Sequence, residues 1–596
     1  MLGSLNVASQ KGLMERFDST IGGTTVLMPF GGKYQMTPTE LSVQKIPLLK
    51  GETNTASAIS WGFNPEISSW SQFHGGVYAV VESLAKIVAA GGDYKNIKLS
   101  FQEYFQKLGK NPCNWGKPFS ALLGTIKMQM GFSIPAIGGK DSMSGTFNEI
   151  HVPQTLISFA VAPVKANIII SPEFKKSKNK VYIIKHHRLD NYMPNVDELK
   201  ENFEYIHENI KNGNIVSAMT VKCGGIAEAL SKMSFGNRIG VKLEKTISSL
   251  FEKDYGSILV ESTQELNYKN ALFLGETIDD YKITSDDFIV DMEKAENIWL
   301  GKLNSIFPYT IKDKKENYIW TPYEKKEILV CKNKVAKPKV LIPAFPGTNC
   351  EYDAARVFEK AGGESNILVF RNITKDFIND SINRFVKELE NSQILMLPGG
   401  FSSGDEPDGS GKFIATVLTN PYIAEAISKF LEKDGLILGI CNGFQALIKS
   451  GLLPYGEIGK ITENSPTLTF NKIGRHVSQM VTTKVVSNKS PWLHGIEVGS
   501  EFEIPVSHGE GRFFANDDVI KTLFTNGQVA TQYVDMKGNP TNEFPFNPNG
   551  SSYAIEGITS LDGKIFGKMG HSERYGKDIF KNIGGNKNQK IFENGI

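Results

Sequence analysis

The sequence predicts an α/β protein, and two regions indicate this fold class. Between residues 340 and 440, apolar strand-like stretches alternate with helical ones; the stretches are VLIPA (340–344), DAARVFEKAGG (353–363), ILVF (367–370), SINRFVKELE (381–390), QILMLPGG (393–400) and LILGI (436–440). Such alternation is typical of a parallel sheet with helical crossovers. The first 165 residues mix both element types, with a helix predicted over 76–90 and a buried strand over 156–164.

Changes in residue composition and apolar pattern along the chain predict three units. A lysine-rich stretch, KNKVAKPK (332–339), is typical of a linker. Residues 166–337 begin with polar sequence and then show strand and helix patterns, including a helix over 226–233 that opens after two glycines. We therefore expect an α/β subdomain over 1–165, a second α/β subdomain with the linker over 166–337, and a C-terminal domain over 338–596.

Composition narrows the class of protein. Of the 596 residues, 40% are hydrophobic and 22% are charged, and the net charge is only +2, so no overall field favours nucleic acid or a membrane surface. No apolar run reaches the roughly 18 residues that a membrane span needs, and the first residues do not resemble a secretory signal. The five cysteines lack paired spacing, which argues against a disulfide framework or zinc site and favours a reducing cytosol.

A candidate nucleophile lies at the end of the last strand of the alternating region. The segment GLILGICNGFQALIKSG (435–451) places Cys441 at a strand-to-helix turn between Gly439 and Gly443. Small neighbours allow the strained turn of a nucleophile elbow, and the N-terminus of the next helix favours thiolate. Taken alone, this segment is equally compatible with a buried structural cysteine.

Two further segments could complete a catalytic site. Backbone N–H groups in the turn Gly399-Gly400-Phe401 could form an oxyanion hole, although an ordinary glycine-rich loop would have the same sequence pattern. A cysteine nucleophile also needs a base and an orienting carboxylate, which His571 and Glu573 could supply from one face of an extended segment. The pair His508 and Glu510 has the same spacing, so chemistry alone does not rank the two pairs.

Resemblance to a known family ranks the two His-x-Glu pairs. The C-terminal segments resemble class I (triad) glutamine amidotransferases, and more closely the glutaminase domain of phosphoribosylformylglycinamidine synthases (formylglycinamide ribonucleotide amidotransferases) of the large single-chain type; the matching motifs are FPGTNCEYD (345–353), PGGFSSGDE (398–406), GICNGFQ (439–445), SHGEGRF (507–513) and GHSER (570–574). The resemblance implies a flavodoxin-like parallel sheet. It also implies a triad of Cys441, His571 and Glu573, with an oxyanion hole and glutamine pocket formed by Gly399, Gly400, Phe401, Asn442 and Gln445.

The matches carry two departures. Ser572 replaces the commoner proline between His571 and Glu573, which leaves both catalytic side chains intact. The loop DEPDGSGKF (405–413) differs from the commonest form, and we expect it to alter the edge of the pocket.

The first 330 residues resemble the second half of the ATP-dependent synthetase region of the same family, which has the fold of aminoimidazole ribonucleotide synthetase; the motifs are FDSTIGGTTVLMPFGGKYQMTP (17–38), GETNTASA (51–58), FHGGVYAVVES (73–83), AAGGDYKNIKLSFQEYF (89–105) and IPAIGGKDSMSGTF (134–147). The segment GGKDSMSG mixes glycine amides, a lysine, a carboxylate and hydroxyls, as phosphate and Mg²⁺ sites do, although a plain turn is the simpler interpretation. By analogy Gly139, Lys140, Asp141 and Ser142 approach ATP or the ribonucleotide.

The metal sites of the family match only in part. Glu82 matches a metal-ligand glutamate, but a solvated helix glutamate is an equally good interpretation. Lys86 stands where many relatives have a metal-binding asparagine, and the segment before Gly224 carries Lys222 and no carboxylate. One of two pseudo-symmetric nucleotide sites is therefore expected to be degenerate.

The implied reaction is the amidation of formylglycinamide ribonucleotide in purine synthesis, with glutamine as ammonia donor and ATP with Mg²⁺ activating the formyl amide oxygen. The resemblance does not extend to the N-terminal domain and the first synthetase half that the family has, and we expect those two parts as partners. Neither nucleic acid nor a membrane is expected as a partner. Two alternatives remain open: a glutaminase that serves another acceptor, and a non-catalytic assembly subunit or fragment.

Overall fold

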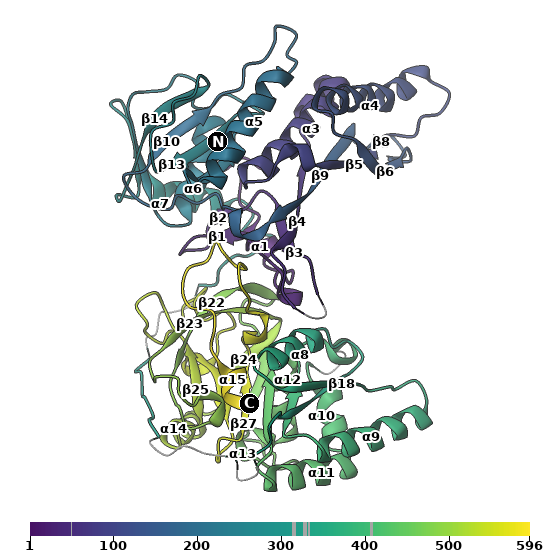
Figure 1. Ribbon diagram of the computed structural model, residues 1–596, viewed down its shortest axis with the longest axis vertical. Helices are drawn as coiled ribbons and strands as arrows, with labels where there is room; N and C mark the ends of the chain where they lie inside the picture. Colours follow the sequence, from purple (N-terminus) through teal and green to yellow (C-terminus); the bar gives the residue numbers. More distant parts are fainter. Residues whose placement is uncertain (49–50, 313–317, 326–330, 332–333, 406–408) are drawn as a thin grey trace.

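The computed structural model describes residues 1–48, 51–312, 318–325, 331, 334–405 and 409–596 (Figure 1). Residues up to about 310 form the upper lobe of Figure 1, and residues from 339 onward form the lower lobe. Each of the three large sheets lies within one of the three segments expected from the sequence. Lys332 and Asn333 of the expected linker lie outside the described residues, and residues 334–338 form neither helix nor strand.

The first sheet is five-stranded and mostly antiparallel. Its strands follow the order β3 (Ser42–Lys45), β4 (Thr55–Gly62), β9 (Thr155–Lys165), β5 (Lys98–Tyr104) and β6 (Ala136–Ser142). Helix α3 (Gln72–Ala89) packs on β4 and β9, and α4 (Pro112–Phe132) packs on α3. Strand β9 shows the alternating burial of a sheet with one covered face. The predicted helix and strand are both present, although α3 begins four residues earlier, where the Ser71 side chain caps the helix by accepting from the His74 N–H.

The segment GGKDSMSG is a strand at its start and not a loop, which corrects the sequence interpretation. Residues 138–142 pair in parallel with β5 as the edge strand β6. A Cβ at Gly139 would lie 2.6 Å from the Phe101 carbonyl oxygen, so glycine is required for this close approach. Gly139 therefore serves strand pairing, and the polar side chains that follow it lie on an exposed edge.

The second sheet is seven-stranded, with the order β11 (Ile215–Thr220), β13 (Ile258–Ser262), β10 (Lys180–Ile184), β14 (Ala271–Ile278), β12 (Gly240–Leu243), β15 (Lys282–Thr284) and β16 (Ile289–Asp291). Its helices are α5 (Val196–Lys211), α6 (Gly225–Phe235) and α7 (Met292–Gly301). The N-terminal residues belong to this unit as well, because the Trp299 indole N–H donates to the Val7 carbonyl at 2.9 Å. The predicted helix over 226–233 is α6.

The third sheet has nine strands, and the expectation of a parallel sheet is correct for five of them. The parallel strands are β18 (Glu364–Val369), β17 (Lys339–Ala344), β19 (Ile394–Leu397), β20 (Leu436–Ile440) and β27 (Ile565–Lys568). Helices α8 (Glu351–Lys360), α9 (Lys375–Glu390), α10 (Lys412–Leu418), α11 (Pro421–Glu432) and α12 (Asn442–Ser450) follow these strands in sequence. Antiparallel strands extend the sheet from β27; they are β26 (Ile555–Thr559), β25 (Val529–Tyr533), β22 (Val477–Val485) and β23 (Glu501–His508).

The antiparallel extension has a physical origin in the sequence. Residues 467–568 contain no long helical crossover of the kind that parallel neighbours need, because α14 (Asp517–Thr525) is the one α-helix of that stretch. The α/β class is nevertheless confirmed for this sheet. In the part of the chain that the structure describes, no helix has both the length and the apolar character to cross a bilayer.

Candidate active site

Cys441 lies in a strained turn between β20 and α12. Its backbone has φ 51° and ψ −103°, a conformation that L-residues rarely adopt. A Cβ at Gly443 would lie 2.0 Å from the Leu397 carbonyl oxygen, and one at Gly439 would lie 2.9 Å from the Gly443 carbonyl. The two glycines therefore let strand and helix approach closely enough to form the elbow. Because Cys441 is the N-cap residue of α12, its sulfur lies at the positive end of that helix.

His571 and Glu573 form a buried pair after β27. The Nδ1 atom of His571 lies 2.6 Å from Oε1 of Glu573, and both side chains are almost fully buried. Burial works to raise the pKa of Glu573, but the charge of His571 and its hydrogen bond outweigh burial and hold that pKa below its usual value. Residues 572–574 form a 3-10 turn, so the extended geometry expected from the sequence is wrong, although both side chains still converge.

His571 and Cys441 both lie beside Gly399, and the Cys441 thiol contacts the Ser507 carbonyl oxygen at 3.7 Å. A Cβ at Gly399 would lie 2.8 Å from Cε1 of His571 and 3.5 Å from Cβ of Cys441. Nε2 of His571 is buried and has no hydrogen-bond partner within the described residues. With Nδ1 held by Glu573, Nε2 is the nitrogen placed to exchange a proton with a nearby sulfur.

The turn at Gly399-Gly400-Phe401 follows β19 beside this pair. Gly400 has φ 148°, and Thr348 forms an isolated bridge with it. The N–H of Phe401 donates to the Gly347 carbonyl oxygen at 2.9 Å. That amide is already used, so the Gly400 amide is the better candidate of the two for an oxyanion hole. Residues 406–408 of the neighbouring loop, for which we expect a change at the pocket edge, lie outside the described residues.

Asn442 and Gln445 brace the loops around the elbow. The side-chain oxygen of Asn442 accepts from the Ser402 N–H at 3.2 Å, and its amide nitrogen donates to Oε1 of Gln445 at 3.0 Å. The amide nitrogen of Gln445 donates to the Glu510 carbonyl oxygen. Both side chains are buried, so their polar atoms hold the walls of the site in place.

The second His-x-Glu pair does not form a catalytic couple. His508 is buried, and its Nδ1 lies 3.2 Å from the amide oxygen of Asn471 rather than from a carboxylate. Burial lowers the pKa of His508 to about 3, with the nearby His476 and His571 adding to the effect. Glu510 instead accepts from the Ser410 N–H at 3.1 Å and anchors the loop there. This geometry favours His571 as the base.

Three residues that the sequence interpretation did not single out also lie at this site. Nη2 of Arg574 donates to Sγ of Cys350 at 3.2 Å, and that sulfur lies 4.0 Å from Nδ1 of His571. Nη1 of Arg574 contacts both carboxylate oxygens of Asp18 at 3.0 Å. The motifs FDSTIGG, FPGTNCEYD and GHSER contain all three residues, but only the fold shows that these motifs meet.

Asp18 connects the two lobes beside the candidate active site. Burial raises its pKa, but the charges of Arg574 and His571 and several hydrogen bonds outweigh burial and hold that pKa at about 2. Close by, the Gly22 N–H donates to the Asp353 carboxylate at 3.0 Å, and the Ser478 N–H donates to the Glu15 carbonyl at 2.8 Å. The waist between the lobes in Figure 1 therefore contains hydrogen bonds and an ion pair that reach a neighbour of the candidate triad, beside a buried apolar cluster formed by Met28, Met480, Ile579, Phe580 and Ile583.

The residues expected to contact phosphate are not part of this site. They lie on edge strand β6 of the first sheet. Gly139, Lys140 and Asp141 are exposed, and Ser142 is half-buried. Asp141 pairs in register with Glu103 of β5, whose carboxylate oxygens are buried without hydrogen-bond partners in the described residues. Burial, and then the charge of Asp141, raise the pKa of Glu103 to about 7.

The expected metal ligand Glu82 does not fit a divalent cation. Its Oε1 atom lies 2.8 Å from the ammonium nitrogen of Lys86 one helical turn along α3. Its Oε2 atom accepts from the Phe63 N–H at 3.3 Å. Because both oxygens have protein donors, the carboxylate is engaged by an ammonium group where Mg²⁺ was expected.

Comparisons with known proteins match the C-terminal domain. The model of the CobB/CobQ-like glutamine amidotransferase domain matches residues 337–596. The phosphoribosylformylglycinamidine synthase subunit PurQ of Methanococcus maripaludis is 38% identical over 240 residues, which is 40% of this chain and 82% of that protein. The PurQ subunit of Treponema denticola is 37% identical over 250 residues, 40% of this chain and 88% of that protein. A structure of PurLQS from Thermotoga maritima is 30% identical, covers 43% of this chain and 97% of its own, and has a TM-score of 0.32.

Proposed function

Because the chain belongs to the glutaminase family of phosphoribosylformylglycinamidine synthases, we propose that it releases ammonia from glutamine for the ATP-dependent amidation of formylglycinamide ribonucleotide. The observation that carries the proposal is the strained Cys441 beside Gly399, next to His571, whose Nδ1 atom is held 2.6 Å from Glu573. A nucleophile, a base and an orienting carboxylate are the parts that amide hydrolysis by a cysteine requires.

In the first half of the reaction, the sulfur of Cys441 attacks the carbonyl carbon of the glutamine side-chain amide. Nε2 of His571 takes the thiol proton, and Glu573 stabilises the imidazolium through Nδ1–H. Backbone N–H groups, with Gly400 the best placed in the Gly399–Phe401 turn, stabilise the oxyanion. The tetrahedral intermediate then collapses, the C–N bond breaks, and ammonia leaves with the proton that His571 returns.

In the second half, water resolves the glutamyl thioester. His571 removes a proton from the water as its oxygen attacks the thioester carbon. The C–S bond breaks, glutamate leaves, and the proton returns to the sulfur. Each cycle therefore consumes one glutamine and one water and yields one glutamate, one ammonia and one proton, with the cysteine regenerated.

The first test separates glutamine use from ammonia use. In the complete enzyme, Cys441→Ala is expected to abolish amidine formation from glutamine and to leave formation from added ammonium salt intact. The expectation follows because the thiol has no part in the chemistry at the ribonucleotide. Equal loss of both activities, with the circular dichroism spectrum unchanged, would contradict this division of labour.

We further propose that residues 1–337 contribute to the ATP-dependent step, with edge strand β6 facing ATP or the ribonucleotide. The support is the resemblance of the motifs in this region and the exposed cluster of Gly139, Lys140, Asp141 and Ser142. Because Glu82 is paired with Lys86, it does not fit Mg²⁺, and we propose that the Mg²⁺ bound with ATP lies at a position other than Glu82. Removal of the Lys140 charge through Lys140→Ala is expected to raise the KM for ATP or ribonucleotide without changing glutamine hydrolysis; an unchanged KM for both would contradict the assignment.

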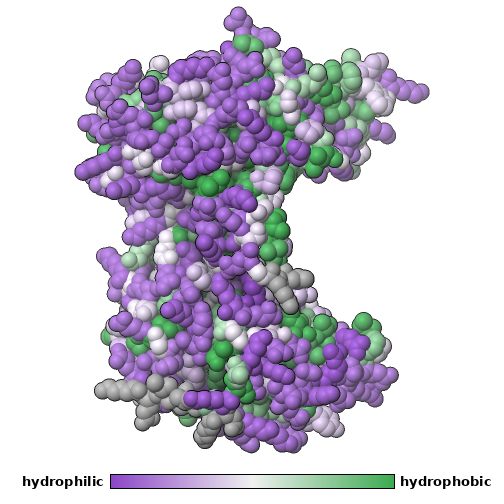
Figure 2. Space-filling model, viewed as in Figure 1, coloured by the Kyte–Doolittle hydropathy of each residue, from purple (hydrophilic) through white to green (hydrophobic). Residues whose placement is uncertain are grey.

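We also propose that a first synthetase half is the partner of this chain. Helix α4 carries an exposed apolar stripe, in which Phe119 is 63% exposed and Met130 is 75% exposed; the other members are Trp115, Leu123 and Ile126. In Figure 2 the upper right arm, which corresponds to α4 in Figure 1, shows this apolar colour. A stripe of this kind is typical of a surface that another element covers.

A turnover assay with this chain alone tests the partner. The purified chain, supplied with Mg-ATP, ammonium salt and formylglycinamide ribonucleotide, is expected to make no amidine until the other half is added. Robust turnover by the chain alone would show that it needs no partner.

We place the enzyme in the cytosol, since no disulfide joins any of the five cysteines in the structure.

A further inference from the structure

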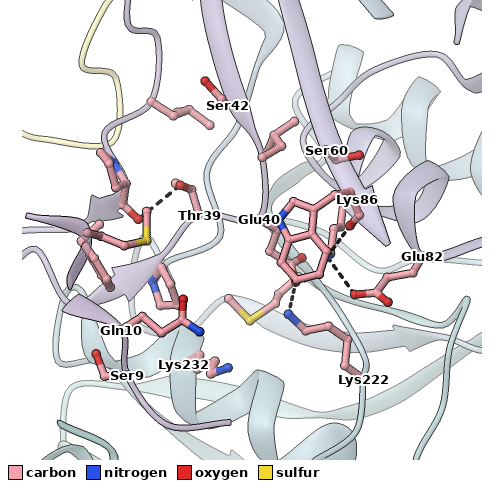
Figure 3. A pocket seen from close by; sticks show the side chains of 18 of the residues that line it. Ser9, Gln10, Thr39, Glu40, Ser42, Ser60, Glu82, Lys86, Lys222 and Lys232 are labelled. Atoms are coloured by element: carbon pink, nitrogen blue, oxygen red, sulfur yellow. Dashed lines mark hydrogen bonds and ion pairs between the residues drawn. The ribbon is translucent and has the colours of Figure 1, made fainter. Parts of the chain in front are cut away.

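A cavity of about 890 Å³ lies between the first two units, and three lysine–glutamate pairs, two of them buried and one half-buried, line part of it (Figure 3). Strand β4 and helix α3 supply one wall, and β11 and helix α6 supply the other. The six charged residues are Glu40, Glu82, Lys86, Lys222, Glu228 and Lys232. This charge cluster lies outside the glutaminase site and has no role in the steps proposed above.

The first pair lies on α3 and the second crosses between the units. Nζ of Lys86 lies 2.8 Å from Oε1 of Glu82 and donates to the Trp61 carbonyl oxygen at 2.7 Å. Nζ of Lys222 lies 2.7 Å from Oε1 of Glu40. Figure 3 shows both ammonium groups projecting toward their carboxylates inside the cavity.

The third pair lies on α6. Nζ of Lys232 lies 2.5 Å from Oε1 of Glu228, one helical turn apart. The other oxygen of Glu228 accepts from the Gly224 N–H at 2.8 Å. Both residues of this pair are buried.

The carboxylates have little capacity left for a metal ion. Glu40 accepts from the N–H and the hydroxyl of Thr220 at 2.8 and 2.7 Å, in addition to Lys222. Glu82 and Glu228 each receive a backbone N–H and an ammonium group. Mg²⁺ requires about six oxygen ligands in octahedral geometry, and ammonium groups would repel it from these oxygens.

The charges also balance without an ion, because three ammonium groups stand against three carboxylates. Burial works to lower the pKa of Lys222, but the charges of Glu40, Glu228 and Glu82 outweigh burial and raise that pKa above its usual value. Burial works to raise the pKa of Glu40, yet Lys222 and Lys86 hold that pKa below its usual value. The shifts of Lys222 and Glu40 therefore favour the charged form of both groups in the pair that crosses between the units, whereas burial lowers the pKa of Lys232.

We propose that the three lysine ammonium groups take the place of divalent cations in this cavity, so that the charge cluster is a metal-free centre that links the first two units. Lys86 and Lys222 carry the argument, because each places its nitrogen on a carboxylate that faces the cavity. A protein-borne cation cannot dissociate, so the link between the units is independent of the Mg²⁺ concentration. This inference stands apart from the proposed glutaminase, since it involves none of its residues.

The test uses the whole chain and Mn²⁺ as the probe. Wild-type protein is expected to show no change in Tm with added Mn²⁺ or EDTA, and no Mn²⁺ bound at this cavity by electron paramagnetic resonance. The variant Lys86→Asn/Lys222→Asp removes two cations and adds oxygen ligands beside Glu82 and Glu40. We expect it to lower the Tm by about 5 °C or more, because unpaired buried carboxylates are costly, and to bind Mn²⁺ with partial recovery of the Tm.

Two controls make the result decisive. Lys95→Asn removes a lysine from an exposed pair with Glu204 and is expected to leave the Tm within about 1 °C and to create no Mn²⁺ site. If the double variant does not fold, Lys86→Asn alone is measured in the same way. Wild-type binding of Mn²⁺ that disappears in Glu82→Gln would overturn the proposal. A folded lysine variant that binds no Mn²⁺ would also overturn it, since the lysine would then not occupy a cation position.

Discussion

Replacement of His571 and of His508 by alanine should give opposite results, although both residues belong to a His-x-Glu pair. His571 presents a buried, unpartnered Nε2 beside Cys441, and its Nδ1 is held 2.6 Å from Glu573. Removal of the base from a catalytic triad costs about 10³–10⁶-fold in kcat, or roughly 4–8 kcal/mol of transition-state stabilisation. We therefore expect His571→Ala to lower glutamine hydrolysis by at least three orders of magnitude, as measured by glutamate release.

His508→Ala is the matched variant because the side chain is equally buried but has no carboxylate partner. It loses a hydrogen bond to Asn471 and some packing, which is expected to cost about 1–3 kcal/mol of folding free energy. Glutamate release and alkylation of Cys441 by a glutamine-like electrophile should both stay within about tenfold of wild type. The assignment is wrong if His508→Ala abolishes alkylation while His571→Ala preserves it.

Three further predictions address the interface, a buried acid and the apolar stripe. The pKa of Asp18, about 2, lies below the unfolded value of about 3.9, so its ion pair with Arg574 stabilises the fold above pH 4 and is lost as the pH falls toward 2; Asp18→Asn should remove that part of the acid dependence in thermal melts, and an unchanged acid limb would contradict the pairing. The raised pKa of Glu103, about 7, means that stability declines between about pH 4.3 and 7 as the folded state holds a proton that the unfolded state has released; Glu103→Gln should flatten this decline, and an identical pH profile would be evidence against a buried acid. Phe119→Ser with Ile126→Ser should weaken association with the other synthetase half at least tenfold while glutamine hydrolysis persists, as measured by analytical ultracentrifugation and glutamate release; unchanged association would exclude α4 as the contact.

The sequence was sufficient where local patterns determine structure. Apolar alternation with helices predicted the parallel strands β17 to β20, and the flanking glycines predicted the turn at Cys441, because no Cβ fits at Gly439 or Gly443. The strand β6 was misread as a loop. Its glycines suggested a turn, whereas the structure uses Gly139 to bring the chain close to the Phe101 carbonyl oxygen.

The remaining features depend on contacts between distant segments. Arg574 meets Asp18 over a separation of 556 residues, and no spacing rule relates them. Spacing alone did not separate His571 from His508, because their sequence spacing to a glutamate is identical; the family resemblance ranked them, and the structure shows Nδ1 of His571 beside Glu573 and Nδ1 of His508 beside Asn471. Lys86 and Lys222 were visible in the sequence as departures from the family, but only the structure shows that both place an ammonium group on a carboxylate.

The central claim is that Cys441 forms a covalent glutamyl thioester. The most direct measurement is mass spectrometry of acid-quenched enzyme during turnover with glutamine, followed by peptide mapping. The account predicts a glutamyl adduct on the peptide that contains Cys441, its absence in Cys441→Ala, and its presence in Cys113→Ala, which removes an exposed cysteine. An adduct on another residue, or glutamine hydrolysis by Cys441→Ala at the wild-type rate, would contradict it.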